Sequence, residues 1–157
     1  MDQHGNWGLI IEHQPNSDVI KRYTMTSCPF CELQTTPKNS RIVDQNDSAL
    51  TLRDAYPLSP GHTLVIPKRH VASFFALSEV EQHDLLRLVN TQHAALKTEF
   101  EFQDCNVGIN DGPLAGQTVA HCHIHLIPRY SGDVADPRGG IRWVIEDKAD
   151  YWSVNRR

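Results

Sequence analysis

Apolar and polar positions alternate most regularly in residues 121–130, HCHIHLIPRY, where histidine occupies three successive alternate positions. A period of two predicts a β-strand. Successive side chains of a strand point to opposite faces, so His121, His123 and His125 are expected to share one face, opposite the apolar residues between them. Three imidazoles on one face are costly to bury unless something binds there. The pattern therefore favours a metal site or a catalytic row over an ordinary strand face.

Further runs of strand character occur on both sides of this row. Residues 41–43 and 49–53 are separated by the turn-forming sequence QNDS, and residues 62–67, HTLVIP, are almost entirely apolar or β-branched. This last run predicts a buried central strand. Residues 106–110 and 141–145 are also expected to be strands.

Between residues 67 and 106 the period becomes helical. Ser78 and Glu81 have the spacing of a capping box, which predicts that a helix starts there and runs to about Phe100. Leu85 and Leu96 lie on its apolar stripe, which is expected to pack on the sheet. His83 and His93 on the same helix are expected to be surface groups.

The composition is that of one ordinary globular domain. The chain has 157 residues, of which 39% are hydrophobic and 22% charged, and its net charge is -4. Such a balance gives no basic surface for nucleic acid or anionic membranes, so neither is expected as a partner. The N-terminus has no basic segment followed by an apolar one, and no apolar run approaches the length of a membrane span. We therefore expect a cytoplasmic protein.

Two of the four cysteines form the motif CPFC, Cys28 and Cys31, whereas Cys105 and Cys122 are isolated. In a reducing compartment a CxxC pair indicates metal or redox chemistry more than a structural disulfide. Without a second CxxC, the pair can be half of a zinc site, a redox pair or two incidental thiols.

Immediately before the histidine row lies a glycine-rich loop, DGPLAGQTV. Glycine lets main-chain N–H groups approach a ligand closely, and such groups can hold phosphate oxygens. A metal site made of the row alone is disfavoured, because an extended strand keeps the imidazoles from converging and no carboxylate follows until Asp133. A neutral imidazole attacking phosphorus fits the loop better.

These residues resemble a known family. HCHIHLIP fits the alternating signature of the histidine triad (HIT) hydrolases and transferases, and AGQTV and PGHTLVIPKRH match its other segments at the same spacing. The similarity spans about Cys28 to Pro128 and favours the bacterial diadenosine-polyphosphate hydrolases and fragile-histidine-triad members. It implies an α+β fold with about five antiparallel strands, one long helix and a short one. Residues 25–157 would form this domain, residues 1–24 an extension packed on it, and two copies a homodimer.

The resemblance also implies roles for individual residues. His123 matches the nucleophile that attacks the α-phosphorus and becomes nucleotidylated, His125 the neighbour that contacts the phosphate, and His62 the histidine that supports them. The nucleotide-binding positions are Asn110, Gly116, Gln117 and Thr118 for the phosphates, Asp54 for the ribose hydroxyls and Leu52 for the base. Apart from the resemblance, Asp54 would be interpreted as a solvated carboxylate, and Asn110 equally well as a turn residue.

A structural zinc is the further implication. Its ligands would be Cys28, Cys31, His70 and His121, a Cys₂His₂ set that tetrahedral zinc accepts. The reaction itself would require no catalytic cofactor.

The resulting hypothesis is a hydrolase of dinucleoside polyphosphates such as diadenosine tetraphosphate, with nucleotides as its substrates. A nucleoside phosphoramidase of the histidine-triad nucleotide-binding type is one alternative. A nucleotide-binding adaptor with vestigial catalysis is another.

Overall fold

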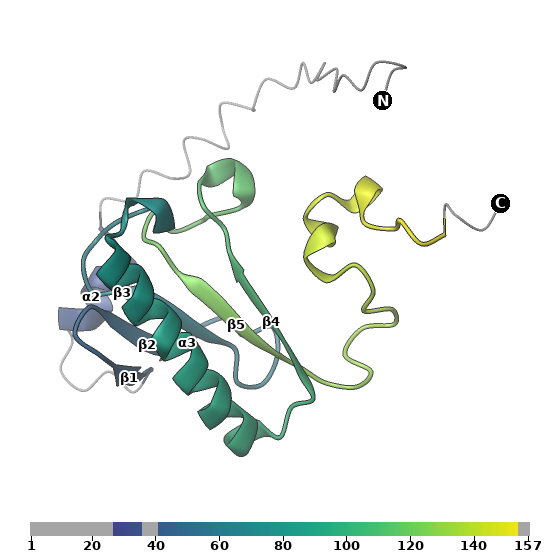
Figure 1. Ribbon diagram of the computed structural model, residues 1–157, viewed down its shortest axis with the longest axis horizontal. Coiled ribbons are helices and arrows are strands. Elements are labelled where there is room, and N and C mark those ends of the chain that lie inside the picture. Colours follow the sequence, from purple (N-terminus) through teal and green to yellow (C-terminus); the bar gives the residue numbers. More distant parts are fainter. Residues whose placement is uncertain (1–26, 36–40, 154–157) are drawn as a thin grey trace, which may run out of the picture.

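The computed structural model describes residues 27–35 and 41–153. Within these ranges five strands form one antiparallel sheet in the order β1-β2-β3-β5-β4 (Figure 1). The strands are β1 (Ile42–Gln45), β2 (Ala49–Arg53), β3 (Thr63–Pro67), β4 (Asp104–Ile109) and β5 (Ile124–Arg129). The predicted α+β architecture is confirmed. The expected N-terminal extension, residues 1–24, lies outside the described ranges.

Two α-helices accompany the sheet, a short α2 (Pro29–Thr35) and a long α3 (Glu79–Phe100). The predicted capping box is present at the start of α3: the Ser78 hydroxyl accepts the Glu81 N–H, and the Glu81 carboxylate accepts the Ser78 N–H. Four short 3-10 turns complete the described elements: η1 (Phe74–Ala76), η2 (Pro113–Ala115), η3 (Gly140–Val144) and η4 (Glu146–Lys148).

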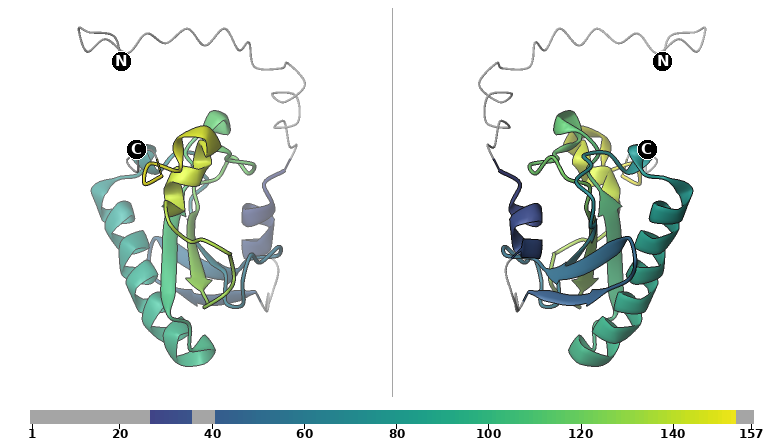
Figure 2. Two further views of the ribbon diagram at one scale, coloured as in Figure 1. Left: turned by 90° about the vertical axis from the view of Figure 1, so that its right-hand side faces the viewer. Right: turned by 90° about the vertical axis from the view of Figure 1, so that its left-hand side faces the viewer.

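The helices lie on opposite faces of the sheet (Figure 2). On one face Leu85 and Leu88 of α3 pack against alternate residues of the strands, including Val65 and Ile124. On the other face Phe30 of α2 packs against the neighbouring set, which comprises Leu50, Leu52, Leu64 and Ile66. Because both faces of β3 are covered, its residues are all buried, as the apolar run predicted. In the described part of the chain, no helix is both long and apolar enough to cross a membrane.

The histidine row is less regular than predicted, because β5 begins only at Ile124. The N–H of His121 bonds to Val119 O and that of Cys122 to Val71 O, both at 2.7 Å, instead of joining a strand ladder. The alternation of sides nevertheless persists. Cys122 packs in the cluster under α3, whereas the rings of His121 and His123 both contact Phe30 on the opposite side.

The strand predicted at residues 141–145 is wrong, since this segment forms the 3-10 turn η3. Gly139 and Gly140 have φ values of 89° and 48°, which turn the chain away from an extended course. The Arg142 N–H then bonds to Gly139 O and the Ile145 N–H to Arg142 O, so local bonds replace a ladder. The segment lies beyond the edge strand β4, yellow in Figure 1.

Candidate active site and metal-binding cluster

Three of the predicted catalytic histidines lie together where β3 and β5 pair. His125 is in β5, His123 immediately precedes that strand, and His62 immediately precedes β3. Pairing of Leu64 with His125 sets the register, so the His62 and His125 ring centroids lie 5.3 Å apart. The His123 ring lies 5.0 Å from that of His125. Sheet geometry thus brings together residues that are far apart in the sequence.

Hydrogen bonds define which ring nitrogens of His62 and His125 carry protons. A backbone N–H can only donate, and the Leu58 N–H reaches His62 Nδ1 at 3.2 Å, so neutral His62 carries its proton on Nε2. That Nε2 lies 3.0 Å from His125 Nδ1 and donates to it. The proton of neutral His125 is therefore on Nε2, where it can donate to a ligand oxygen.

Burial keeps both imidazoles neutral. It lowers the pKa of His125 to about 4, with the neighbouring His123 and His62 acting in the same direction and Asp54 opposing them. Burial also lowers the pKa of His62, again opposed by Asp54, whose Oδ2 lies 3.6 Å from His62 Nε2. Asp54 also accepts the Tyr56 N–H through Oδ1 at 2.8 Å.

The low pKa of His125 gives a pH-dependent stability. In the unfolded chain this histidine has its ordinary pKa of 6.5, so below that pH the unfolded state binds more protons than the folded state, whose pKa is about 4. Stability is therefore lost as pH falls. Relative to His125→Asn, we expect wild type to lose roughly 2 to 3 kcal/mol in the free energy of unfolding between about pH 7 and about pH 4.5, measured by urea denaturation. Parallel pH profiles for the two proteins would contradict the assignment.

His123 has a different tautomer from its neighbour. Its Nδ1 lies 2.8 Å from the backbone carbonyl of His121, which can only accept, so Nδ1 carries the proton. The lone pair of the neutral ring is then on Nε2. The side chain is only 5% exposed and packs against the Phe30 ring at 5.5 Å. The neutral ring therefore has one defined lone pair, on Nε2, which is what a nucleophile requires.

The glycine-rich loop that precedes the histidine row is folded by hydrogen bonds within itself. Gly116, with φ 90°, donates its N–H to Pro113 O, and the Gln117 N–H bonds to Gly112 O. A Cβ at Gly116 would lie 3.9 Å from the Asn110 amide, so the loop folds directly against that side chain. Among the described residues, the Asn110 amide and the Thr118 hydroxyl have no hydrogen-bond partner, which leaves both available to a ligand.

Gln117 is engaged differently from the expected phosphate contact. Its side chain is buried, donates to Ala72 O at 2.7 Å and accepts the Gly112 N–H at 2.9 Å. Its amide therefore braces the loop against the segment that follows β3. Direct contact of Gln117 or Gly116 with phosphate stays a prediction. Leu52 is fully buried in the cluster with Phe30, so its place in a base pocket also stays a prediction.

Sequence reasoning missed the role of Asp111. Its Oδ2 accepts the Ser73 hydroxyl at 3.0 Å and the Phe74 N–H at 2.8 Å, which anchors the start of the glycine-rich loop. A carboxylate directly after Asn110 was the available signal. Val71 O also accepts the Cys122 N–H. The segment that begins at His70 is therefore bonded to both the glycine-rich loop and the histidine row.

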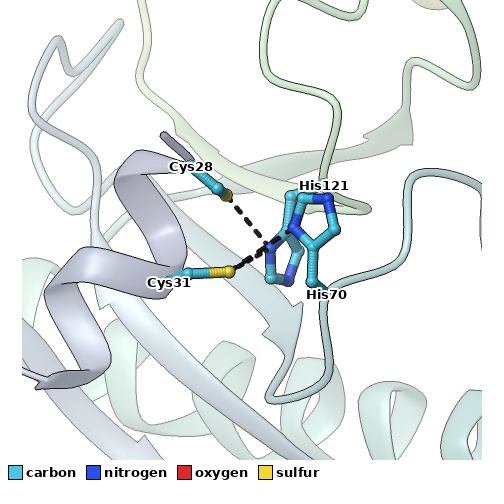
Figure 3. Close-up of side chains that lie close together, drawn as sticks. All are labelled: Cys28, Cys31, His70 and His121. Atoms are coloured by element: carbon cyan, nitrogen blue, oxygen red, sulfur yellow. Dashed lines mark hydrogen bonds between the residues drawn. The ribbon is translucent and has the colours of Figure 1, made fainter. Parts of the chain in front are cut away.

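The four predicted zinc ligands converge in one cluster (Figure 3). Their donor atoms all lie within 4.8 Å of one another: Cys28 Sγ, Cys31 Sγ, and a ring nitrogen each of His70 and His121. Cys28 Sγ is 3.4 Å from His121 Nδ1, and Cys31 Sγ is 3.4 Å from His70 Nδ1. Cys28 precedes α2 and Cys31 lies in its first turn, so the helix presents both thiols to one point.

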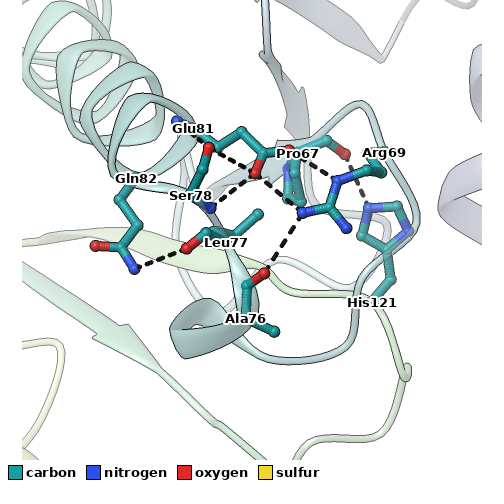
Figure 4. A network of polar contacts seen from close by, with 8 residues as sticks. All are labelled: Pro67, Arg69, Ala76, Leu77, Ser78, Glu81, Gln82 and His121. Carbon is teal, nitrogen blue, oxygen red and sulfur yellow. Dashed lines mark hydrogen bonds and ion pairs between the residues drawn. The ribbon is translucent and has the colours of Figure 1, made fainter.

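The chemistry of these donors fits a zinc ion. With Zn–S near 2.3 Å and Zn–N near 2.0 to 2.1 Å, a sulfur and a nitrogen at two corners of a tetrahedron are about 3.5 Å apart. His121 Nε2 donates to Pro67 O at 2.8 Å (Figure 4), which leaves the Nδ1 lone pair facing the sulfurs (Figure 3). Burial, with Cys28 acting in the same direction, raises the pKa of the Cys31 thiol, and a bound cation would oppose this by favouring the thiolate.

The protein around this cluster is held in place by a second network. Arg69, next to His70, pairs with both carboxylate oxygens of Glu81 at 2.8 and 2.9 Å (Figure 4). Glu81 also caps α3, so the chain between β3 and His70 is tied to the start of the long helix.

A five-stranded antiparallel sheet, two helices on opposite faces and three linked histidines beside a glycine-rich loop define a histidine-triad type of domain. The comparison with protein families agrees, since the HIT domain matches residues 35–132. The chain belongs to the HIT family. Members of this family act as nucleotide hydrolases or transferases, so the chain is an enzyme of that class.

Individual relatives are moderately similar. A bis(5'-adenosyl)-triphosphatase of Saccharomyces cerevisiae is 38% identical over 101 residues, covering 63% of this chain and 46% of the yeast protein. The crystal structure of a HIT family protein from Bacillus anthracis matches with a TM-score of 0.65 and 36% identity, covering 70% of this chain and 78% of the other. A Zn-bound histidine triad family protein from Mycobacterium smegmatis matches with a TM-score of 0.64 and 30% identity, covering 70% and 80%.

Proposed function

We propose that this enzyme hydrolyses dinucleoside polyphosphates such as diadenosine tetraphosphate at the α-phosphate, through a covalent nucleotidyl intermediate on His123. The observation that carries the proposal is the hydrogen bond from His123 Nδ1 to His121 O, because it leaves Nε2 as the nucleophilic nitrogen. The similarity to a yeast bis(5'-adenosyl)-triphosphatase supports this substrate class over others handled by the family.

In the first step, His123 Nε2 attacks the α-phosphorus. The bond from that phosphorus to the bridging oxygen breaks, and its electron pair departs with the leaving phosphate chain. His125 Nε2–H donates to a phosphoryl oxygen, and the Asn110 amide and Thr118 hydroxyl hold the others. Water then attacks the phosphorus of the P–N intermediate. Its oxygen bonds to the phosphorus of the released mononucleotide as the P–N bond breaks, and the electron pair of that bond returns to His123 Nε2. One proton of the water goes to solvent, and neutral His123 is restored.

We assign the nucleoside to β2 and the residue that follows it. Asp54 has lone pairs beyond its bond to the Tyr56 N–H, and we assign these to the ribose hydroxyls. Leu52, buried in the cluster with Phe30, would support the base pocket from beneath.

Zinc has a structural part in this proposal. Cys28, Cys31, His70 and His121 would hold it, and when bound it supplies a fixed crosslink between α2, the end of β3 and the histidine row. The Zn-bound relative from Mycobacterium smegmatis supports this assignment.

The deciding experiment compares turnover of diadenosine tetraphosphate with that of an adenosine 5′-phosphoramidate under the same conditions. We expect the dinucleotide to have the higher kcat/KM and to release AMP. A higher kcat/KM for the phosphoramidate would instead identify a nucleoside phosphoramidase. Nucleotide binding without turnover of either compound would identify an adaptor.

We further propose that the chain works in the cytoplasm as a homodimer, with residues 25–157 forming the catalytic domain. β4 supports pairing, because within the described sheet it bonds to β5 alone and is therefore an edge strand.

A further inference from the structure

A cavity of about 770 Å³ extends from His125 to the C-terminal segment. One end is bounded by His125 and Asn110, and the other by Ile141, Trp143 and Val144 of η3. We call this space the distal groove. Its volume is within the range of about 300 to 1,000 Å³ that is usual for small-molecule sites. The proposed mechanism uses only the end at His125.

The floor of the groove is the histidine face of β4 and β5. Gly108 pairs with His125 and Asn106 with Ile127, so these four residues share that face. Because Gly108 has no side chain, Ile141 of η3 can approach the floor opposite His125. A Cβ at Gly108 would lie 3.7 Å from Ile141 Cδ1, which shows that the C-terminal segment comes within contact distance of this floor.

The far wall is made of apolar side chains in a folded segment. The Trp143 Nε1–H donates to Arg138 O at 2.8 Å, so the polar edge of the ring is satisfied and its orientation is defined. Arg138 in turn stacks over the Trp152 ring at 4.6 Å. Ile141 and Trp143 nevertheless remain 66% and 46% exposed, an unusual cost for large apolar side chains that line a cavity.

The cationic side chains near the groove are already paired. Arg129 makes two bonds to the Asp133 carboxylate, at 2.6 and 2.8 Å, and a third to Asn106. The Arg129 guanidinium lowers the pKa of Asp133 to about 2, so the ion pair persists at neutral pH. Arg138 is paired with Asp136 at 2.6 Å. The η3 end of the groove therefore favours a flat apolar ring over a phosphate group.

We infer that the distal groove binds the nucleobase of the leaving half of the substrate, stacked on Trp143. This inference rests on the proposed function and specifies its substrate as a molecule with two bases. In this arrangement the scissile phosphate lies at His123 and His125, and the reacting nucleoside extends from it toward α2. The leaving chain then runs over Gly108 and Ile127 toward η3, and its terminal base meets the apolar wall.

The test compares two substrates with the same reacting half. Diadenosine tetraphosphate has a second base on its leaving group, whereas adenosine 5′-tetraphosphate has none. Because base stacking on an aromatic side chain contributes about 1 to 3 kcal/mol, Trp143→Ala should lower kcat/KM for the dinucleotide about 10-fold and leave that for adenosine tetraphosphate unchanged. Trp143→Phe keeps a ring and should lose less. Ile141→Ala should act in the same direction as Trp143→Ala.

The matched control is Ile145→Ala, a similarly exposed isoleucine of the same segment that does not line the groove. It should change neither substrate. Equal losses on both substrates, or no loss in Trp143→Ala and Ile141→Ala, would overturn the inference.

If wild type turns over neither substrate, the proposed function fails. Binding affinities then test whether the distal groove holds a base. Diadenosine tetraphosphate must then bind more tightly than adenosine 5′-tetraphosphate, and Trp143→Ala must remove that difference. An affinity difference that Trp143→Ala leaves intact would reject the groove.

Discussion

Replacement of His123 by alanine should reduce turnover of diadenosine tetraphosphate by about 10⁴-fold, because the variant has no nitrogen to attack phosphorus. The neighbouring His125 cannot substitute for it. Its Nδ1 accepts the proton of His62 and its remaining nitrogen carries a proton, so no lone pair of the neutral ring faces the substrate. We would measure AMP release under single-turnover conditions.

His93→Ala is the matched control for this experiment, because His93 lies on α3, on the far side of the sheet from the helix α2. The control should retain wild-type turnover. Acid quenching during turnover should trap a nucleotidylated wild-type protein in the mass spectrum and no adduct in His123→Ala. Retention of turnover within a factor of about ten by a folded His123→Ala would show that another group attacks the phosphorus.

Local sequence patterns determined most of the sheet and the long helix. Residues 49–53 were expected to form a strand and do, and the Ser78–Glu81 capping box begins α3. In both cases the signal is local: β-branched and apolar residues for the strand, and a side chain three residues from its partner for the cap. Such signals hold because the same residues also face the core.

Other features depend on partners that are distant in the sequence. Gln117 bonds to Ala72 O, so its bracing role depends on a loop 45 residues away. The tautomer of His125 depends on Leu58 through His62. Residues 141–145 have the composition of a strand, but Gly139 and Gly140 turn the chain before it can pair with β4. Only the assembled fold supplies these partners.

Removal of zinc should lower the melting temperature by roughly 8 to 16 °C. A metal at 1,000 times its Kd stabilises the folded state by about 4 kcal/mol, and in a domain of this size each kcal/mol shifts the melting temperature by about 2 to 4 °C. Cys28→Ser with Cys31→Ser should show the same loss without chelator and contain no zinc. Cys105→Ser is the control, since that isolated cysteine lies outside the cluster. If the purified protein contains no zinc and its melting temperature is unchanged by chelator, the zinc site is ruled out.

The Cys28→Ser, Cys31→Ser double substitution should also slow the reaction, although in the proposed mechanism zinc does not contact the substrate. His121 faces the cluster with its ring and holds the His123 Nδ1–H with its backbone carbonyl. Loss of the metal removes the Nδ1 contact of the His121 ring and weakens that hydrogen bond, so the nucleophile is still present but less well oriented. We therefore expect the Cys28→Ser, Cys31→Ser protein to lose roughly 10- to 100-fold in kcat, far less than His123→Ala. A loss as large as that of His123→Ala in a folded protein would mean that the metal acts on the substrate directly.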